Sequence, residues 1–210
     1  MPTDAAGPAV AGAEAVDGRV LSRRGARTRA RLLDVSADVF AAKGLHSTRV
    51  DDIVAAAASS HGTFYLYFSS KEDLFDQLVT QVSTEIQSLV DTLPTITGAT
   101  RGRAALRTWL GDLADLYERR GPVIAAWTEA ELSGERTGRH GDDALGSLVG
   151  GILEQVRVPK RSGLDPAVAS LALVIMVERV NYYATTGRVK VTRDELIDTL
   201  MEIVEAALFA

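Results

Sequence analysis

Apolar residues recur at three- and four-residue intervals along most of the chain, and this spacing predicts helices. The first helix is expected to begin at about Arg27 and to place Leu32, Val35 and Val39 on its inner side. Gly44 is a suitable end for it, because glycine accepts the left-handed conformation common after a helix. No alternation of period two, which would indicate β-strands, competes with this pattern.

Capping residues delimit three more helices in the first half of the chain. Thr48 is expected to cap a second helix through RVDDIVAAAA, and Ser60 a short third one. In the stretch SSKED, each serine precedes an acidic residue by three positions, as in a capping box. The fourth helix is then expected to run to about Leu93, where Pro94 ends it.

Five helical segments are expected in the remainder. They cover residues 101–120, the stretch PVIAAWTEAELSG opened by Pro122, residues 139–157, a segment capped by Asp165 that runs to about Thr186, and a last one capped by Thr192. The sequence therefore predicts an all-α protein of about nine helices.

The composition of the chain restricts the class of protein further. The chain has 210 residues, of which 46% are hydrophobic, and it contains no cysteine. Residues 1–22 are interpreted as a disordered tail that leads into a basic arm. The most apolar run, LALVIMV at 171–177, is far shorter than the ~20 residues of a membrane helix. We therefore expect a cytoplasmic protein with no membrane partner.

Positive charge is concentrated in one part of the chain. The net charge is −5, yet residues 19–75 hold nine Lys/Arg against six Asp/Glu. Six arginines and no acid fall within thirteen positions: Arg19, Arg23, Arg24, Arg27, Arg29 and Arg31. Such a run is either a solvated basic face or an arm that lies along nucleic-acid phosphates, and Arg27 is a candidate phosphate contact.

The second and third predicted helices have the plan of a helix-turn-helix, at about residues 49–68 within a domain of residues 23–75. In this plan the second helix of the motif enters the major groove, and its first residues face the base edges. Those residues are His61, Gly62 and Thr63. The imidazole of His61 can donate or accept a hydrogen bond, and Gly62 lets the backbone come close to the DNA. The hydroxyl and methyl of Thr63 can contact base edges.

The stretch RTRARLLDVSADVFAAKGLHSTRVDDIVAAAASSHGTFYLYFSSKEDLFDQLV resembles the DNA-binding domain of the TetR family of bacterial transcriptional regulators. GTFYLYFSSKEDLF is its most specific part. The resemblance implies phosphate contacts for Thr48, Tyr65, Tyr67 and Lys71. It also implies a homodimer that binds a palindromic operator in double-stranded DNA.

The turn departs from the family pattern of alanine, glycine, valine and serine, because the chain has Ala58 and Ser59 at the two middle positions. A left-handed alanine costs roughly 1 kcal/mol. The four aromatic residues after the turn fall on two different faces of the predicted third helix, according to their spacing. Phe64 and Phe68 are four residues apart and are expected in the core, whereas Tyr65 and Tyr67 lie off that face.

For residues 76–210 the resemblance implies a domain that dimerises and binds a small apolar or amphipathic effector. The last two helices carry broad apolar faces, and Leu173, Val177, Leu200 and Val204 are candidate dimer contacts, or else a monomer core. Candidate pocket residues, each equally suited to a core, are Trp109, Tyr117, Trp127, Met176, Tyr182 and Tyr183.

The function predicted on this basis is a sequence-specific DNA-binding regulator, most simply a ligand-responsive repressor. The alternative is an all-α small-molecule-binding protein whose helix-turn-helix is degenerate. An enzyme is not expected, because the sequence has no Ser/His/Asp set, paired carboxylates or phosphate loop. No cofactor and no metal site are expected either.

Overall fold

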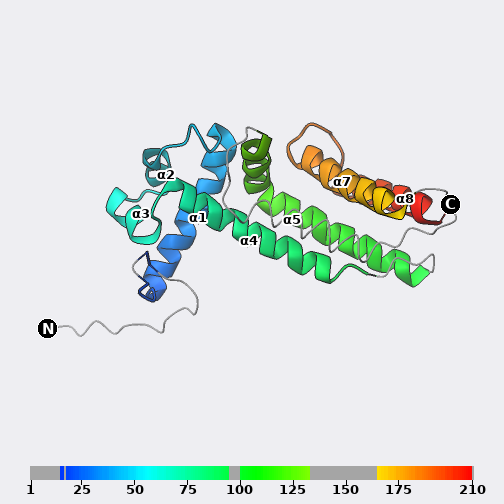
Figure 1. Cartoon of the computed structure of the whole chain (residues 1–210), viewed down its shortest axis with the longest axis horizontal. Helices are drawn as coiled ribbons and strands as arrows, with labels where there is room; N and C mark the ends of the chain where they lie inside the picture. Colours follow the sequence, from blue (N-terminus) through cyan, green and yellow to red (C-terminus); the bar gives the residue numbers. More distant parts are fainter. Residues whose placement is uncertain (1–14, 17, 95–99, 133–164, 210) are drawn as a thin grey trace. The chain divides into compact units, whose positions relative to one another are not determined.

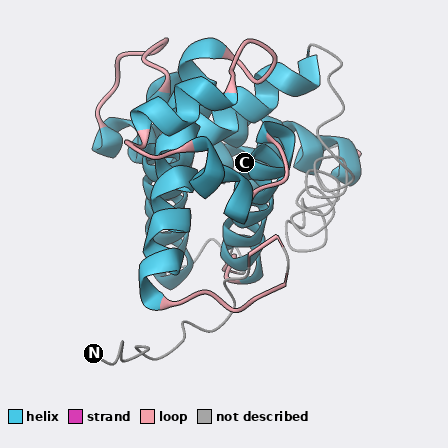
Figure 2. Ribbon diagram, turned by 90° about the vertical axis from the view of Figure 1, so that its left-hand side faces the viewer, coloured by secondary structure: helices cyan, strands magenta, loops and turns pink. Residues whose placement is uncertain are grey.

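The computed structural model of the chain describes residues 15–16, 18–94, 100–132 and 165–209. Within these ranges every regular element is a helix (Figures 1 and 2), as the hydrophobic spacing predicts. The helices are α1 (Arg23–Lys43), α2 (Val50–Ala56), α3 (His61–Tyr67), α4 (Lys71–Asp91), α5 (Thr100–Leu132), α7 (Pro166–Thr185) and α8 (Arg193–Phe209).

The chain forms two compact units. The first contains Met1–Val79 and Ala126–Thr137, and the second contains Thr80–Ala125 and Gly138–Ala210. Helices α4 and α5 therefore each begin in one unit and end in the other. The helix predicted at 139–157, like residues 1–14 of the predicted tail, lies outside the described residues.

Aromatic side chains form the core of the first unit. Phe40 of α1 and Phe75 of α4 meet edge to face, with their ring centroids 5.1 Å apart. Phe64 and Phe68 are completely buried, as their spacing predicts. Burying a side chain of this size stabilises the fold by about 1.5–3 kcal/mol. These rings fix α3 against the rest of the unit and so fix which of its residues face outward.

Backbone hydrogen bonds place two helix starts differently from the prediction. Helix α1 begins four residues before Arg27, because the Ser22 hydroxyl accepts the Gly25 N–H at 3.3 Å. The prediction of Thr48 as the cap of α2 is wrong. Arg49 is the N-cap, and its N–H donates to the Asp52 carboxylate at 2.9 Å. The Thr48 hydroxyl donates instead to the carbonyl of Gly44, at 2.7 Å.

Helix α5 continues through Pro122, so the predicted break at this residue is wrong. A proline inside a helix removes one backbone hydrogen bond and costs about 3 kcal/mol. Packing offsets this cost, because Val123 and Ile124 directly after it are buried. Gly121 allows α7 to approach closely, since a Cβ there would lie 2.5 Å from the Thr185 methyl carbon.

Helices α7 and α8 begin at the capping residues that the sequence predicts. The Asp165 carboxylate accepts the N–H groups of Ala167 and Val168, both at 3.0 Å, at the start of α7. At the start of α8, Thr192 and Glu195 form a reciprocal capping box. The seven helices of the described residues differ from the nine predicted because two merge in α5 and one falls outside those residues.

Arginines fasten α8 to α5 in the second unit. Arg103 pairs with Glu205 at 2.6 Å, and Arg193 of α8 pairs with Asp115 at 2.7 Å. Arg107 pairs with Asp198 between them. Such half-exposed pairs contribute up to about 1 kcal/mol each, and more as a row than singly.

Helix α7 is the most apolar helix described. Among the described residues, its stretch Ala167–Thr185 is the one long and apolar enough to cross a membrane by length and composition alone. The uninterrupted apolar run at 171–177 is too short to predict this longer stretch. The charged pair Glu178 and Arg179 lies within the stretch. Charges inside a membrane span are rare, so this pair argues against a membrane span here.

Candidate DNA-binding surface and apolar pocket

The N-terminus of α3 is capped as the sequence predicts. The Ser60 hydroxyl accepts the Thr63 N–H at 3.2 Å and lies 2.9 Å from the Thr63 hydroxyl. His61 and Gly62 are exposed and Thr63 is half-buried. The three residues predicted to read bases therefore share the open first turn of this helix, as the motif requires.

The two tyrosines of α3 have different surroundings. Tyr65 is 52% exposed, so its hydroxyl is free to meet a phosphate. Tyr67 is only 7% exposed, because it follows Phe64 by three residues and shares its buried face. Its hydroxyl oxygen would lie 3.3 Å from a Cβ at Gly25, so the ring covers α1 at a position without a side chain. The phosphate contact predicted for Tyr67 has no support in this placement.

The turn between α2 and α3 keeps helix-turn-helix geometry without glycine. Among the described residues, Ala58 is the one non-glycine residue with a positive φ, at 46°. Its N–H donates to the Ala55 carbonyl at 3.1 Å, and the Ser59 N–H donates to the Val54 carbonyl at 2.8 Å. These two bonds form a Schellman motif with alanine in the position that glycine usually takes. The turn is therefore strained but correctly formed.

His61 is held by a neighbour that the sequence analysis did not identify. Its Nε2 lies 2.6 Å from a carboxylate oxygen of Asp51, the second residue of α2. Its ring also stacks on Tyr65, with a centroid separation of 6.4 Å. An acid ten residues earlier carries no local signal, because the turn alone brings the two side chains together.

Lys71 is enclosed by backbone oxygens. Its ammonium donates to the carbonyls of Leu45, His46 and Thr48 at 2.8, 3.0 and 2.7 Å. An ammonium has three donors, so these bonds use all of them. The Thr48 side chain is only 1% exposed. The phosphate contacts predicted for these two residues remain predictions, and both side chains already have partners within the first unit.

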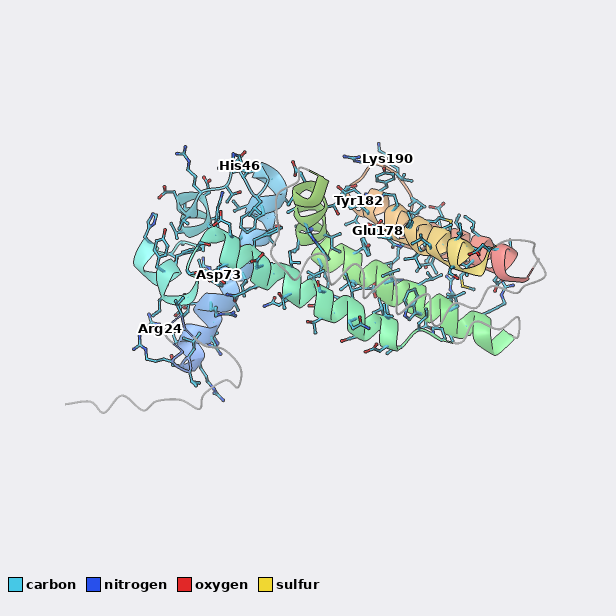
Figure 3. The ribbon with its side chains drawn as sticks, viewed as in Figure 1. Arg24, His46, Asp73, Glu178, Tyr182 and Lys190 are labelled. Carbon is cyan, nitrogen blue, oxygen red and sulfur yellow. The ribbon has the colours of Figure 1, made fainter. Side chains whose placement is uncertain are left out.

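The arginines of α1 divide into free and engaged groups. Arg24, Arg27 and Arg31 are exposed, and with the turn residues they line a hollow of ≈ 300 Å³ (Arg24 is labelled in Figure 3). Arg29 instead bonds to Gln77 and lies over the Phe68 ring, 5.4 Å from its centroid. Burial lowers the pKa of the Arg29 guanidinium. The exposure of Arg27 is compatible with a phosphate contact, which remains a prediction, whereas Arg29 packs within the first unit.

Comparisons with known proteins agree with this surface. Residues 32–78 match the model of the family described as "Bacterial regulatory proteins, tetR family". An uncharacterized HTH-type transcriptional regulator of Bacillus subtilis, YdgC, is 36% identical over 73 residues, which are 35% of this chain and 37% of YdgC. The HTH-type transcriptional repressor KstR2 of Mycobacterium tuberculosis is 42% identical over 64 residues, 30% of each chain.

Residues 32–78 thus carry the DNA-binding part of the TetR family. The match covers about a third of the length of these relatives. Among solved structures, a transcriptional regulator from Aquifex aeolicus VF5 has a TM-score of 0.66 at 20% identity, over 85% of this chain and 98% of its own. NalD of Pseudomonas aeruginosa has a TM-score of 0.63 at 19% identity, over 88% and 97%. The TetR fold therefore extends to the second unit.

The second unit contains an apolar pocket of ≈ 80 Å³. Helices α4, α5, α7 and α8 all contribute to its lining. Of the predicted pocket residues, Trp109 and Tyr117 line it; the Trp109 indole N–H is satisfied by the Leu89 carbonyl at 2.8 Å. Trp127 is buried in the first unit, and Met176 is half-buried outside the lining.

Tyr182 and Tyr183 also lie outside the pocket lining. Their ring centroids are 5.8 Å apart, and the Arg179 guanidinium lies over both rings, 5.2 Å from Tyr182 and 6.0 Å from Tyr183. These tyrosines therefore hold an arginine by cation–π contact rather than an effector.

Two ionisable groups line the pocket among the described residues, the carboxyl of Glu178 on α7 (Figure 3) and the phenol of Tyr117 on α5. Burial raises the pKa of Glu178, while Arg179 and the Tyr117 hydrogen bond oppose that rise. Burial also raises the pKa of the Tyr117 phenol, and the neighbouring Glu178 charge adds to the effect. The place of Glu178 could not be predicted from the sequence, because nothing local distinguishes a pocket acid from a surface ion pair.

The four residues predicted for a dimer interface have partners within the chain itself, and their dimer contacts remain a prediction. Leu173, Val177 and Val204 line the pocket, and Leu200 is only 2% exposed within the chain. Instead, α7 exposes Val168, Leu171 and Ile175 at 65, 38 and 52%. Positions i, i+3 and i+7 share one helix face, so these three form an exposed apolar stripe. Ile203 of α8 is also exposed, at 42%.

Proposed function

We propose that this chain is a homodimeric transcriptional regulator that binds a palindromic operator through α3 and responds to a small effector in the second unit. The observation that carries the proposal is the exposed first turn of α3, capped by Ser60 and fixed by the buried Phe64 and Phe68. In a helix-turn-helix dimer, two such turns enter successive major grooves about 34–36 Å apart.

The DNA-binding role has further support from charge. Arg24, Arg27 and Arg31 are exposed on α1 of the first unit, and Tyr65 is exposed on α3. Phosphate contacts of this kind position a protein on DNA, whereas contacts to base edges give sequence preference. The formed turn at Ala58 argues against the degenerate helix-turn-helix that the alternative function requires.

The dimer is supported by the stripe of Val168, Leu171 and Ile175 on α7. Exposed apolar stripes on soluble helices usually mark interaction surfaces. A second copy related by a two-fold axis presents the same stripe, so the surface is complementary to itself. KstR2 and NalD are both named as repressors, which favours repression for this chain and, with it, a cytoplasmic location beside the chromosome.

Effector control is supported by the chain path. Helix α4 starts in the first unit at Lys71, and its later residues Ile86 and Val90 line the pocket of the second unit. A molecule that fills the pocket therefore contacts a helix that begins directly after the DNA-binding motif. Such contact couples two sites if the occupied and empty states differ in how well they bind DNA.

The deciding experiment is footprinting of the full chain on the DNA that flanks its own gene. We expect protection of two half-sites with dyad symmetry, separated by about one helical turn. Competition with bulk DNA at moderate salt must leave the protection intact, because nonspecific binding falls steeply with salt. Equal affinity for the flanking DNA and for bulk DNA would refute the proposal.

A further inference from the structure

The pocket of the second unit has an unusually uneven lining. Fourteen described residues line it, and eleven of them are aliphatic. The twelfth is Trp109, whose indole N–H already donates to a backbone carbonyl. The remaining two, Tyr117 and Glu178, bring the phenol and the carboxyl together at one place. A ligand therefore meets apolar surface everywhere except at this pair.

The charge at that place is negative or neutral. Tyr117 donates its hydroxyl hydrogen to the Glu178 carboxyl, so the pair presents oxygen atoms with free acceptor capacity. No lysine, arginine or histidine is among the described lining residues. The nearby Arg179 approaches Glu178 from its Nε at 3.3 Å, but its guanidinium lies over the Tyr182 and Tyr183 rings and is not part of the lining.

We infer that this pocket takes a small apolar molecule whose polar group is a hydrogen-bond donor, best an amine, and that it rejects carboxylates. The inference deepens the proposed function, on which it rests for the role of the ligand as an effector. An ammonium group at the pair gains a charge-assisted hydrogen bond to Glu178. A carboxylate there meets a second negative charge in a site with no lining cation, which disfavours it.

The size of the pocket restricts the class of ligand further. The space of ≈ 80 Å³ exceeds what a single water molecule needs several times over, but it is smaller than the ~150 Å³ cavity known to hold benzene. A thin alkyl chain that enters end-on fits this space better than a ring system. Each further CH₂ group that is buried should then tighten binding about fourfold.

The test uses three probes that share a six-carbon chain and differ in the polar group: hexylamine, 1-hexanol and hexanoate. The chain has two tryptophans, Trp109 and Trp127. In the full-length variant Trp127→Phe, all tryptophan fluorescence comes from Trp109 in the pocket lining. Titration of each probe at neutral pH then gives its affinity directly.

We expect hexylamine to bind about tenfold more tightly than 1-hexanol, and hexanoate to bind more weakly than 1-hexanol. Adding Glu178→Gln should remove the advantage of the amine over 1-hexanol. Glu118→Gln is the matched control, because Glu118 is an exposed glutamate of α5 that does not line the pocket. This control should keep the preference for the amine.

Binding of hexanoate as tight as that of hexylamine would overturn the inference. So would an unchanged Trp109 signal with all three probes, or an amine preference that persists in the Glu178→Gln variant. Operator footprinting on the same protein separates the two proposals. Protection without probe binding refutes only the ligand class, whereas probe binding without any sequence preference refutes only the regulator.

Discussion

The ammonium of Lys71 donates a hydrogen bond of 2.7 Å to the backbone carbonyl of Thr48. Two further bonds, to the carbonyls of Leu45 and His46, complete its shell. The first residue of α4 thus holds the loop between α1 and α2. The resemblance to the TetR family assigns Lys71 to a phosphate, but this geometry gives it a role inside the protein.

We predict that Lys71→Met destabilises the fold more than it alters DNA binding. Three carbonyls lose a charged donor, and hydrogen bonds to charged groups contribute about 1.5–3 kcal/mol. Urea unfolding should show a loss of that order. The salt dependence of DNA affinity should keep its slope, because no phosphate contact is removed.

Arg27→Ala provides the comparison for the salt measurement. Arg27 is exposed on α1, so removing a phosphate contact there should reduce the slope of log K against log salt by about 0.9. Its effect on urea unfolding should be small. If Lys71→Met reduces the slope as much as Arg27→Ala does, the ammonium leaves its carbonyls and binds phosphate in the complex.

The strain at Ala58 predicts a stabilising substitution. Glycine takes a positive φ at no steric cost, so Ala58→Gly should stabilise the first unit by about 1 kcal/mol in urea unfolding. Ala55→Gly is the matched control, because Ala55 is an exposed residue with ordinary helical geometry in the same helix. That change should destabilise by up to about 1 kcal/mol. Equal effects of both changes would show that the turn conformation is not the cause.

The bond between Asp51 and His61 predicts coupling in base preference. Asp51 holds the outer ring nitrogen of His61, so Asp51→Ala frees that nitrogen for a base edge or a phosphate. In the wild-type background this change should alter the ranking of operators that differ by one base pair. In a His61→Ala background the same change should leave the ranking as it is.

A double-mutant cycle over such an operator set measures the coupling, which we expect at about 1 kcal/mol. The loss of a carboxylate near DNA raises affinity for every sequence alike, so only the change in ranking reports on His61. A coupling of zero would mean that the two side chains act independently on DNA.

Local signals account for the features that the sequence predicted well. Ser60, Asp165 and Thr192 cap helices through bonds that span two or three residues, and Gly44 ends α1 with a φ of 74°. Phe64 and Phe68 followed from helical spacing alone. The family pattern also placed Ala58 at the turn position where glycine is usual, and its φ is 46°.

Distant contacts account for the rest. Pro122 stays within α5 because the surrounding core offsets the lost hydrogen bond, which no local pattern reveals. Tyr67 is buried over α1 at Gly25, forty-two positions away in sequence. The apolar stripes of α7 and α8 were recognisable, but which side meets the pocket and which meets solvent depends on how four helices pack.

The exposed stripe on α7 predicts the effect of a charge on self-association. Ile175→Asp should convert the dimer to monomers in sedimentation experiments, because an isolated charge in an apolar interface is strongly unfavourable. Val189→Asp is the control; Val189 is 45% exposed but lies in the loop between α7 and α8. It should leave the dimer intact. A wild-type chain that sediments as a monomer at micromolar concentration would contradict the proposed dimer.

The raised pKa of Glu178 predicts a loss of stability as the pH rises. Burial holds its proton more tightly in the folded chain than in the unfolded chain, where the ordinary value is 4.5. The folded state therefore binds more protons in the range just above pH 4.5, and the free energy of unfolding must fall as pH increases through that range. Glu178→Gln should remove this slope and raise stability at neutral pH relative to wild type.

The exposed Glu118→Gln controls for the loss of one carboxylate. Thermal unfolding of the three proteins between pH 4.5 and 8 gives the comparison. The difference between Glu178→Gln and wild type should widen in favour of the variant as the pH rises and then level off above the folded pKa. A difference that narrows with rising pH would mean that Arg179 outweighs burial and lowers the pKa of Glu178.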